Sequence, residues 1–285
     1  MKNLHIALSV FSSEIDRPYE NALRMAGVVE TAAKEGAEMV VFPELSVTGY
    51  GIRGEVSPIQ VFGVGRHKAV TLLKETADRL NVVIMAGLAE KSDFSETEKM
   101  QPNDFSYPIF LSQAVFIPDK PTTVYRKLHL GPPEVDRFKA GDTLPVFHAL
   151  STSFGVQLCY DAHFPELSAL MTIKGAEVII IPHASPRKTP EEKLRSWLLH
   201  LTARSYDNSV FVLAVNQVGE YINGMHFPGV AIALNPSGEL IASYTGNVER
   251  LLHVELKKED MDIVRGHRMR YFLPNRRDDL ADLPS

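Results

Sequence analysis

The sequence has few of the features that mark specialised protein classes. It contains one cysteine in 285 residues, which excludes an intramolecular disulfide framework and any paired-cysteine metal or redox motif. Basic residues are not in excess, since 30 Lys and Arg stand against 35 Asp and Glu, for a formal net charge of −5. Nucleic acid is therefore not an expected partner. The apolar runs, such as Val178–Ile181, are far too short to cross a bilayer, so no membrane partner is expected either.

What the chain does contain is typical of a globular protein. Hydrophobic residues make up 45% of it and charged residues 23%. The N-terminal residues alternate between apolar and polar and soon reach Glu14 and Asp16, which fits a first β-strand better than a signal peptide. We therefore expect a cytoplasmic protein with one domain over residues 1–256. Residues 257–285 are richer in charge, show no clear hydrophobic period and are expected to form a tail.

One pattern recurs, in which a helical stretch closes on glycine and a short run rich in β-branched residues follows. The pattern predicts helices over residues 18–35, 66–80 and 165–174, each leading into a strand, over residues 39–42, 82–86 and 178–181. Asp16 is a candidate N-cap for the first helix. A capping box at Thr189–Glu192 predicts a further helix with an apolar stripe of Leu194, Trp197, Leu198 and Leu201. Further strands are expected over residues 210–215, 230–234, 240–243 and 251–256.

Two segments of the chain echo each other. Residues 36–44 (GAEMVVFPE) and 175–183 (GAEVIIIPH) share glycine, alanine, glutamate, four apolar residues and proline. The echo predicts an α/β protein built from two similar layered units packed in one domain. Helix-glycine-strand junctions can also converge on such sequences by chance.

Ionisable residues directly after apolar runs are candidates for a site, because reactive groups in α/β sheets collect where strands end. Glu44 follows a run that should be buried, so its pKa should rise toward that of a general base. Lys127 lies in a segment where strand alternation sends Tyr125, Lys127 and His129 to one side and can turn an ammonium inward. Cys159 lies at a strand-to-helix turn, where backbone N–H groups favour a thiolate.

Each of these residues also has an ordinary explanation when taken alone. Glu44 can cap a turn, Lys127 can lie on a solvated face, and Cys159 can pack in the core. Glu134, in the loop after Lys127, can simply be solvated. Together they supply a thiol nucleophile, a carboxylate base and a fixed cation, which is what acyl transfer from an unactivated C–N bond requires.

Two other chemistries would need residue patterns that the chain does not offer. A papain-like site would use His163 or His183 as the base for Cys159, but neither histidine lies in a signature of that kind. A zinc site would need an HExxH motif or paired ligands, and the sequence has none. We therefore expect no metal and no organic cofactor.

At these residues the chain closely resembles the nitrilase superfamily, the carbon–nitrogen hydrolases. The blocks VFPELSVTGY (41–50), YRKLHL (125–130) and GVQLCYDAHFPE (155–166) are similar to its three signature blocks, in the same order. The resemblance implies that Glu44 is the general base, that Lys127 stabilises the tetrahedral intermediate and that Cys159 is the nucleophile. Glu134 falls where the family has a second glutamate that positions the substrate and the lysine.

The resemblance also implies a fold and an assembly. The family fold is a four-layer αββα sandwich that dimerises to αββααββα. The Trp197 helix and the arginine-bearing tail resemble its dimer-forming segments, so a homodimer or an assembly of dimers is expected; the arginines are Arg265, Arg268, Arg276 and Arg277. Two positions depart from the family pattern, Phe110–Ala114 before the lysine block and Pro118–Lys120 in a turn.

The expected substrate is a small linear carboxamide, cleaved through a thioester to an acid and ammonia. The sequence after the nucleophile, Cys159-Tyr160-Asp161, resembles the amidase and carbamoylase branches more than the nitrile-cleaving one. A nitrile, an N-carbamoyl amine or an amine acyl acceptor remain alternatives, as does an inactive member that only binds. Residues expected to contact the substrate are Tyr50, Tyr160, His163 and His183, and Arg187 or His163 can meet a substrate carboxylate.

Overall fold

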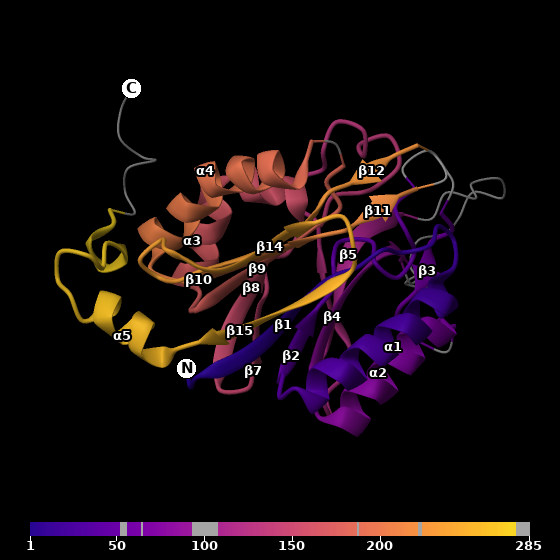
Figure 1. The fold of residues 1–285 in the computed structure, drawn as a ribbon, viewed down its shortest axis with the longest axis horizontal. Coiled ribbons are helices and arrows are strands. Elements are labelled where there is room, and N and C mark those ends of the chain that lie inside the picture. The colour runs from indigo at the N-terminus through magenta and orange to yellow at the C-terminus, as the bar shows by residue number, and fades with distance from the viewer. Residues whose placement is uncertain (52–55, 64, 93–107, 187, 222–223, 278–285) are drawn as a thin grey trace.

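A computed structural model describes residues 1–51, 56–63, 65–92, 108–186, 188–221 and 224–277 (Figure 1). Arg187 lies outside these ranges. Two β-sheets pack face to face and helices cover their outer faces, which makes a four-layer αββα sandwich. The predicted fold class is therefore confirmed. Within the described part of the chain, no helix combines the length and the apolar character that a bilayer span requires.

The first sheet has seven strands and is covered by two N-terminal helices. Its order is β15 (Arg250–Leu256), β1 (Leu4–Val10), β2 (Met39–Val41), β4 (Val83–Lys91), β5 (Ile109–Phe116) and β6 (Thr123–Arg126), and β3 (Ile59–Gln60) also pairs with β4. The central strands β1, β2 and β4 are parallel, whereas β15, β5 and β6 join antiparallel. Helices α1 (Pro18–Lys34) and α2 (Lys68–Leu80) lie side by side on the outer face (Figure 1).

The second sheet has six strands and the same arrangement. Its order is β14 (Leu240–Gly246), β13 (Gly229–Leu234), β10 (Phe211–Asn216), β9 (Val178–His183), β8 (Thr152–Val156) and β7 (Val146–Ala149). Strands β8, β9 and β10 are parallel, and β7, β13 and β14 join antiparallel. Helices α3 (Pro165–Ile173) and α4 (Pro190–Asn208) cover this sheet (Figure 1). A short pair, β11 (Gly219–Glu220) and β12 (His226–Phe227), stands apart.

The two sheets are equivalent strand by strand, with β15-β1-β2-β4-β5-β6 matching β7-β8-β9-β10-β13-β14. The echo falls on equivalent junctions, α1 to β2 and α3 to β9. Gly36 and Gly175 end the two helices at φ +91° and +98°, a left-handed conformation that glycine adopts without strain. The prediction of two similar layered units is confirmed. Glu44 follows β2, and His183 ends β9, the equivalent strand of the second sheet.

Side-chain alternation along the strands separates the core into layers. In β1, Leu4, Ile6 and Leu8 pack between the two sheets, whereas Ala7 packs toward α1 and α2. Residues on successive positions of a strand point to opposite faces, so a strand that is apolar on both faces must be covered on both. This explains why the parallel strands read as continuous apolar runs in the sequence.

Helix α1 starts differently from the prediction. It begins at Pro18 after Arg17, which makes no side-chain capping bond. Asp16 adopts φ +56°, and its Oδ1 accepts a hydrogen bond from the Ser57 N–H at 2.9 Å. Asp16 therefore stabilises a turn and is not the N-cap. The capping box of α4 is confirmed, because Thr189 Oγ1 accepts from the Glu192 N–H and Glu192 Oε2 accepts from the Thr189 N–H.

The apolar stripe of α4 faces the protein's own core. Trp197 and Leu201 are buried, and Leu194 and Leu198 pack against the core between the layers. This apolar face of α4 is therefore packed inside its own chain, and the dimer interface that the family resemblance implies stays a prediction. The opposite side of α4 exposes Leu199 and Tyr206.

The C-terminal segment contains a helix that the sequence analysis missed. Helix α5 (Lys258–Arg265) buries Met261 and Val264 against the same chain. The first part of the expected tail is therefore packed on its own domain. Its place in an assembly remains a prediction.

Candidate active site

Glu44 follows β2 and is held by the other half of the molecule. The residue is 1% exposed, and its Oε2 accepts a hydrogen bond from the Ala184 N–H at 3.0 Å. Its carbonyl oxygen accepts from Gln217 Nε2 at 2.7 Å. Burial raises the pKa of Glu44, while Lys127 opposes this shift. A raised pKa suits a group that must accept and return a proton near neutral pH.

Close packing behind Glu44 fixes its backbone. Gly87 of β4 lies so near that a Cβ there would sit 2.3 Å from the Leu45 nitrogen and 2.7 Å from Glu44 Cα. Only glycine fits such an approach. In the block that departs from the family pattern, Gln113 Nε2 donates to the Phe42 carbonyl at 3.1 Å. The departure therefore still supports the segment that leads to Glu44.

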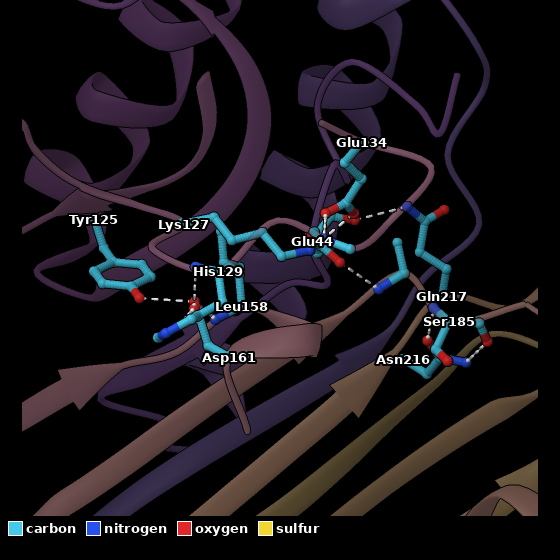
Figure 2. Close-up of polar contacts among 12 residues, drawn as sticks. Glu44, Tyr125, Lys127, His129, Glu134, Leu158, Asp161, Ser185, Asn216 and Gln217 are labelled. Carbon is cyan, nitrogen blue, oxygen red and sulfur yellow. Dashed lines mark hydrogen bonds and ion pairs between the residues drawn. The ribbon is translucent and has the colours of Figure 1, made fainter. Parts of the chain in front are cut away.

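Lys127 lies directly after β6 and points inward, as the strand alternation predicts. It is 1% exposed, whereas Arg126 turns the other way and pairs with Glu90. Lys127 Nζ lies 2.9 Å from Glu44 Oε1 and 2.9 Å from Glu134 Oε1 (Figure 2). Burial alone would lower the pKa of Lys127, but the nearby carboxylates of Glu44 and Glu134 raise it overall. The lysine is therefore a fixed cation.

Glu134 belongs to this centre although it was the weakest candidate when taken alone. Its Oε2 accepts from the Gly131 N–H at 2.6 Å, and it is 7% exposed. Its other oxygen contacts Lys127. The loop after the lysine thus folds back so that one ammonium lies between two carboxylates.

Cys159 opens a 3₁₀ turn, η1 (Cys159–His163), after β8. It adopts φ +42°, a conformation that is uncommon for residues other than glycine and that gathers at functional sites. Burial and the charge of Glu44 raise the pKa of the thiol to about 12, and Lys127 opposes the shift. The expectation that this turn would favour a thiolate is therefore wrong, because desolvation and a nearby carboxylate outweigh the turn. The resting nucleophile is a neutral thiol.

Asp161 joins the lysine segment to the nucleophile turn, and the sequence analysis gave it no role. Its Oδ2 accepts from the Tyr125 hydroxyl at 2.7 Å and from the Leu158 N–H at 3.0 Å. Its Oδ1 accepts from the His129 N–H at 2.8 Å. Figure 2 shows Lys127 extending from this cluster toward Glu44 and Glu134. Asp161 thus fixes the segments on both sides of Lys127 to the turn that carries Cys159.

Comparison with known proteins identifies the family of this chain. Residues 15–265 match the carbon-nitrogen hydrolase family. The chain belongs to this family. This carbon-nitrogen hydrolase is 28% identical to a nitrilase from Pyrococcus abyssi, over 93% of this chain and 92% of the relative. It is 26% identical to the omega-amidase NIT3 of Saccharomyces cerevisiae, over 93% and 90% of the two chains. The crystal structure of Nit3 from the same yeast superposes with a TM-score of 0.79 at 25% identity, covering 93% and 94%.

The residues predicted to contact substrate in this carbon-nitrogen hydrolase lie at different depths. Tyr50 is buried, its ring is 5.1 Å from Phe227, and burial together with the charge of Glu44 raises its pKa. Tyr160 is half-buried. His163 is exposed on η1 and stacks on His200 with ring centres 4.7 Å apart. Their contacts with substrate remain predictions.

His183 is buried at the end of β9 and stacks on Trp197, with ring centres 4.3 Å apart. Both of its ring nitrogens lack a hydrogen-bond partner among the described residues. The imidazole therefore makes no bond to the thiol here, and a papain-like pairing with His183 has no support. Burial lowers its pKa well below the usual value, so the ring is neutral.

The described residues contain no group of three or more histidine, cysteine or acidic side chains that could hold a metal ion. The residues that sequence reasoning missed include Ala184 and Gln217, which bind Glu44. Both come directly after a parallel strand, β9 or β10. The same rule that selected Glu44 could have found them if polar and backbone groups had been included.

Proposed function

We propose that this carbon-nitrogen hydrolase is a cytoplasmic amidase that cleaves small carboxamides to an acid and ammonia through a thioester on Cys159. The observation that carries the proposal is the position of Lys127 Nζ, 2.9 Å from both Glu44 and Glu134. The charges of these three groups also act on the Cys159 thiol. A base, a fixed cation and a nucleophile are therefore available to one reacting carbonyl.

In the first half of the reaction, Glu44 takes the thiol proton as Cys159 Sγ attacks the amide carbonyl carbon. Proton transfer during attack is required because the pKa of the thiol is about 12. The carbonyl oxygen becomes an oxyanion, which Lys127 Nζ and the Tyr160 backbone N–H stabilise. Protonated Glu44 then gives its proton to the leaving nitrogen. Ammonia departs and a thioester remains.

In the second half, Glu44 accepts a proton from water as the water oxygen attacks the thioester. The same oxyanion partners stabilise the second tetrahedral intermediate. Its collapse releases the carboxylic acid, and Glu44 returns the proton to the Cys159 sulfur. Glu134 keeps the ammonium in position through both halves, since it is the second carboxylate bound to Lys127.

Two features favour an amide over a nitrile. The segment Cys159-Tyr160-Asp161 resembles the amidase branches. Its buried Asp161 carboxylate accepts hydrogen bonds from the lysine segment and from the nucleophile turn. An amide must also expel ammonia from a tetrahedral intermediate, and a proton donor such as Glu44 assists that step. The Pyrococcus relative named a nitrilase supports nitrile hydrolysis as the second candidate. N-carbamoyl amines are a third.

The test measures ammonia release from carboxamides, the nitriles with the same carbon chain and N-carbamoyl amines. We expect a higher kcat/KM for each amide than for its nitrile. Mass spectrometry with a slow substrate should detect one acyl adduct on Cys159, and Cys159→Ala should lose turnover with an unchanged fold. Faster nitrile turnover would overturn the substrate class. No turnover of any class, with no adduct, would leave the inactive binding member.

A further inference from the structure

A buried polar network lies behind Glu44, at the place where the two sheets converge. It consists of the side chains of Ser13, Gln217 and Tyr221, all of which are buried. Ser13 lies shortly after β1, and Gln217 directly follows β10. These strands belong to different sheets, yet Phe11 and Gln217 form a parallel bridge between the chain segments that follow them. The network therefore connects the half that carries Glu44 to the half that carries Cys159.

The Gln217 amide has partners at both of its ends. Its Nε2 donates to the Glu44 carbonyl oxygen at 2.7 Å (Figure 2). Its Oε1 accepts from Ser13 Oγ at 2.9 Å and from the Tyr221 hydroxyl. Two hydroxyl donors fix the orientation of the amide, because its oxygen can accept their protons and its nitrogen cannot. The N–H side of the amide is thereby directed at Glu44.

The Tyr221 hydroxyl is kept in the state that this orientation requires. The Ser13 N–H donates to Tyr221 Oη at 3.2 Å, so the hydroxyl oxygen is used as an acceptor and its proton is directed at Gln217. Burial raises the pKa of Tyr221 to about 12, so the hydroxyl carries its proton at neutral pH. It therefore acts as a donor over the range in which a carboxylate base can work.

The bond from Gln217 holds a strained peptide. Leu45, directly after the base, adopts φ +57°, which is uncommon for a residue other than glycine. Such a conformation persists only where the surroundings impose it. The Glu44 carbonyl belongs to the peptide that joins these two residues. Without the Gln217 bond this buried carbonyl would lose its partner, and a relaxing peptide would move the Glu44 carboxylate from its place 2.9 Å from Lys127 Nζ.

We propose that Gln217 positions the catalytic base, and that Ser13 and Tyr221 act through it by fixing the orientation of its amide. The inference rests on the proposed amidase function, in which Glu44 moves the protons. None of the three residues needs to touch the substrate. Tyr221 directly follows β11, and its ring lies 4.9 Å from Phe227 of β12. The position of the short β11–β12 pair is therefore linked to the position of the base.

A double-mutant cycle tests whether the hydroxyl acts through the amide. Gln217→Leu should lower kcat for a carboxamide about tenfold or more with KM changed by less than about threefold, because the base is misplaced and binding is retained. Tyr221→Phe removes one hydroxyl, keeps the ring and should lower kcat about threefold. Added to Gln217→Leu, the same change should lower kcat by less than about 1.5-fold. An equal loss in both backgrounds would show that the tyrosine acts independently and would overturn the proposal.

The pH dependence of kcat/KM separates positioning of the base from a loss of stability. Burial raises the pKa of Glu44 and Lys127 lowers it, so a carboxylate displaced from Lys127 has a higher pKa. The acidic limb of kcat/KM, which reports the free base, should therefore move to higher pH in Gln217→Leu. An acidic limb that stays in place would reject a positioning role.

Tyr244→Phe is the matched control. The Tyr244 hydroxyl donates to the Val248 carbonyl at 3.0 Å, and its side chain packs against the core at β14. This variant loses the same atom and one hydrogen bond, so kcat and the acidic limb should not change. A fall in kcat equal to that of Tyr221→Phe would assign the effect to general stability and contradict the proposal.

Ser13→Ala and Tyr221→Phe provide the answer if Gln217→Leu fails to fold. Each removes one donor to the same amide oxygen, and each should lower kcat about threefold with the acidic limb shifted in the same direction. Unchanged kcat in both variants, with normal turnover in the wild type, would overturn this inference and leave the amidase function standing. If the wild type releases no ammonia from any carboxamide, the proposed function fails and the inference fails with it.

Discussion

The two halves of the molecule share a backbone plan but carry opposite chemistry at equivalent positions. Strands β2 and β9 occupy the same place in their sheets, and each follows a helix that ends on a left-handed glycine. The β2 strand leads to Glu44, which is bonded to Lys127 and Ala184. The β9 strand ends in His183, whose ring nitrogens have no partner in the described structure.

This difference shows how an internally repeated fold acquires one site. The first half supplies Glu44 and Lys127, and the second half supplies Cys159 and the backbone N–H of Ala184. Neither half holds the complete set. The equivalent strand of the second half ends in His183, a buried neutral ring that stacks on Trp197.

The strongest test of the comparison removes charge from the first half. Glu44→Gln should lower kcat by roughly 100-fold or more with the shape preserved, because the proton acceptor is lost. Lys127→Met should be comparably inactive because an oxyanion partner is lost. Ammonia release under saturating substrate measures both.

The rate at which iodoacetamide alkylates Cys159 in Glu44→Gln shows whether Glu44 acts on the thiol or only supports the structure. With the thiol pKa at about 12 in the wild type, alkylation at neutral pH should be slow. Removing the Glu44 charge should lower the pKa of the thiol and speed alkylation even though turnover falls. Slower alkylation together with lost turnover would contradict this account of the thiol.

A smaller loss of activity is expected from a change at Asp161, which joins the lysine segment to the nucleophile turn. Asp161→Asn keeps the size of the side chain but leaves one oxygen to serve the Tyr125 hydroxyl and two backbone N–H groups. We expect kcat to fall about tenfold, with KM changed less, because the lysine and the nucleophile lose their shared anchor. An unchanged kcat would show that packing alone positions them.

Two glycines sharpen the comparison further, one in each half. A Cβ at Gly87 would meet the backbone of Glu44 and Leu45, whereas one at Gly155 in β8 would meet the flexible Met171 side chain, 2.5 Å from its sulfur. Gly87→Ala should therefore lower activity about tenfold by displacing the base. Gly155→Ala should cost little activity, since the methionine can move aside. Equal losses in both variants would remove the distinction.

The mildest prediction concerns acid stability of the second half. Burial holds the folded-state pKa of His183 well below its unfolded value near 6.5. The folded form thus resists protonation, and its stability is fully present above about pH 6.5 and falls as the pH drops. The slope for one such group is about 1.4 kcal/mol per pH unit. Between pH 7.5 and 5, the melting temperature of His183→Gln should fall by less than that of the wild type, as measured by calorimetry.

The sequence predicted the sandwich and the residues at strand ends because both depend on local pattern. Apolar runs after helix-closing glycines are local features, and Glu44, Lys127 and Cys159 each stand at the end of one. The sequence did not predict helix α5, because Met261 and Val264 are its only buried residues within a charged segment. Their burial depends on a core built from distant strands.

The contacts of Asp161 and Lys193 also depend on distant partners. Asp161 bonds Tyr125, which lies 36 residues earlier, and no spacing in the sequence fixes that contact. Lys193 falls in the first turn of a predicted helix, where lysines are usually solvated. It is buried because the segment after β9 folds over it, and tertiary packing alone decides that.

The bond between Glu44 and Ala184 joins residues 140 positions apart, and that between Gln217 and Glu44 joins residues 173 apart. Contacts at such separations form late in folding, because the loops they close are long. Refolding chains should regain helix and sheet signals before they regain turnover. Recovered activity in this enzyme would then report that its two sheets have docked, which makes catalysis a kinetic marker for the last stage of folding.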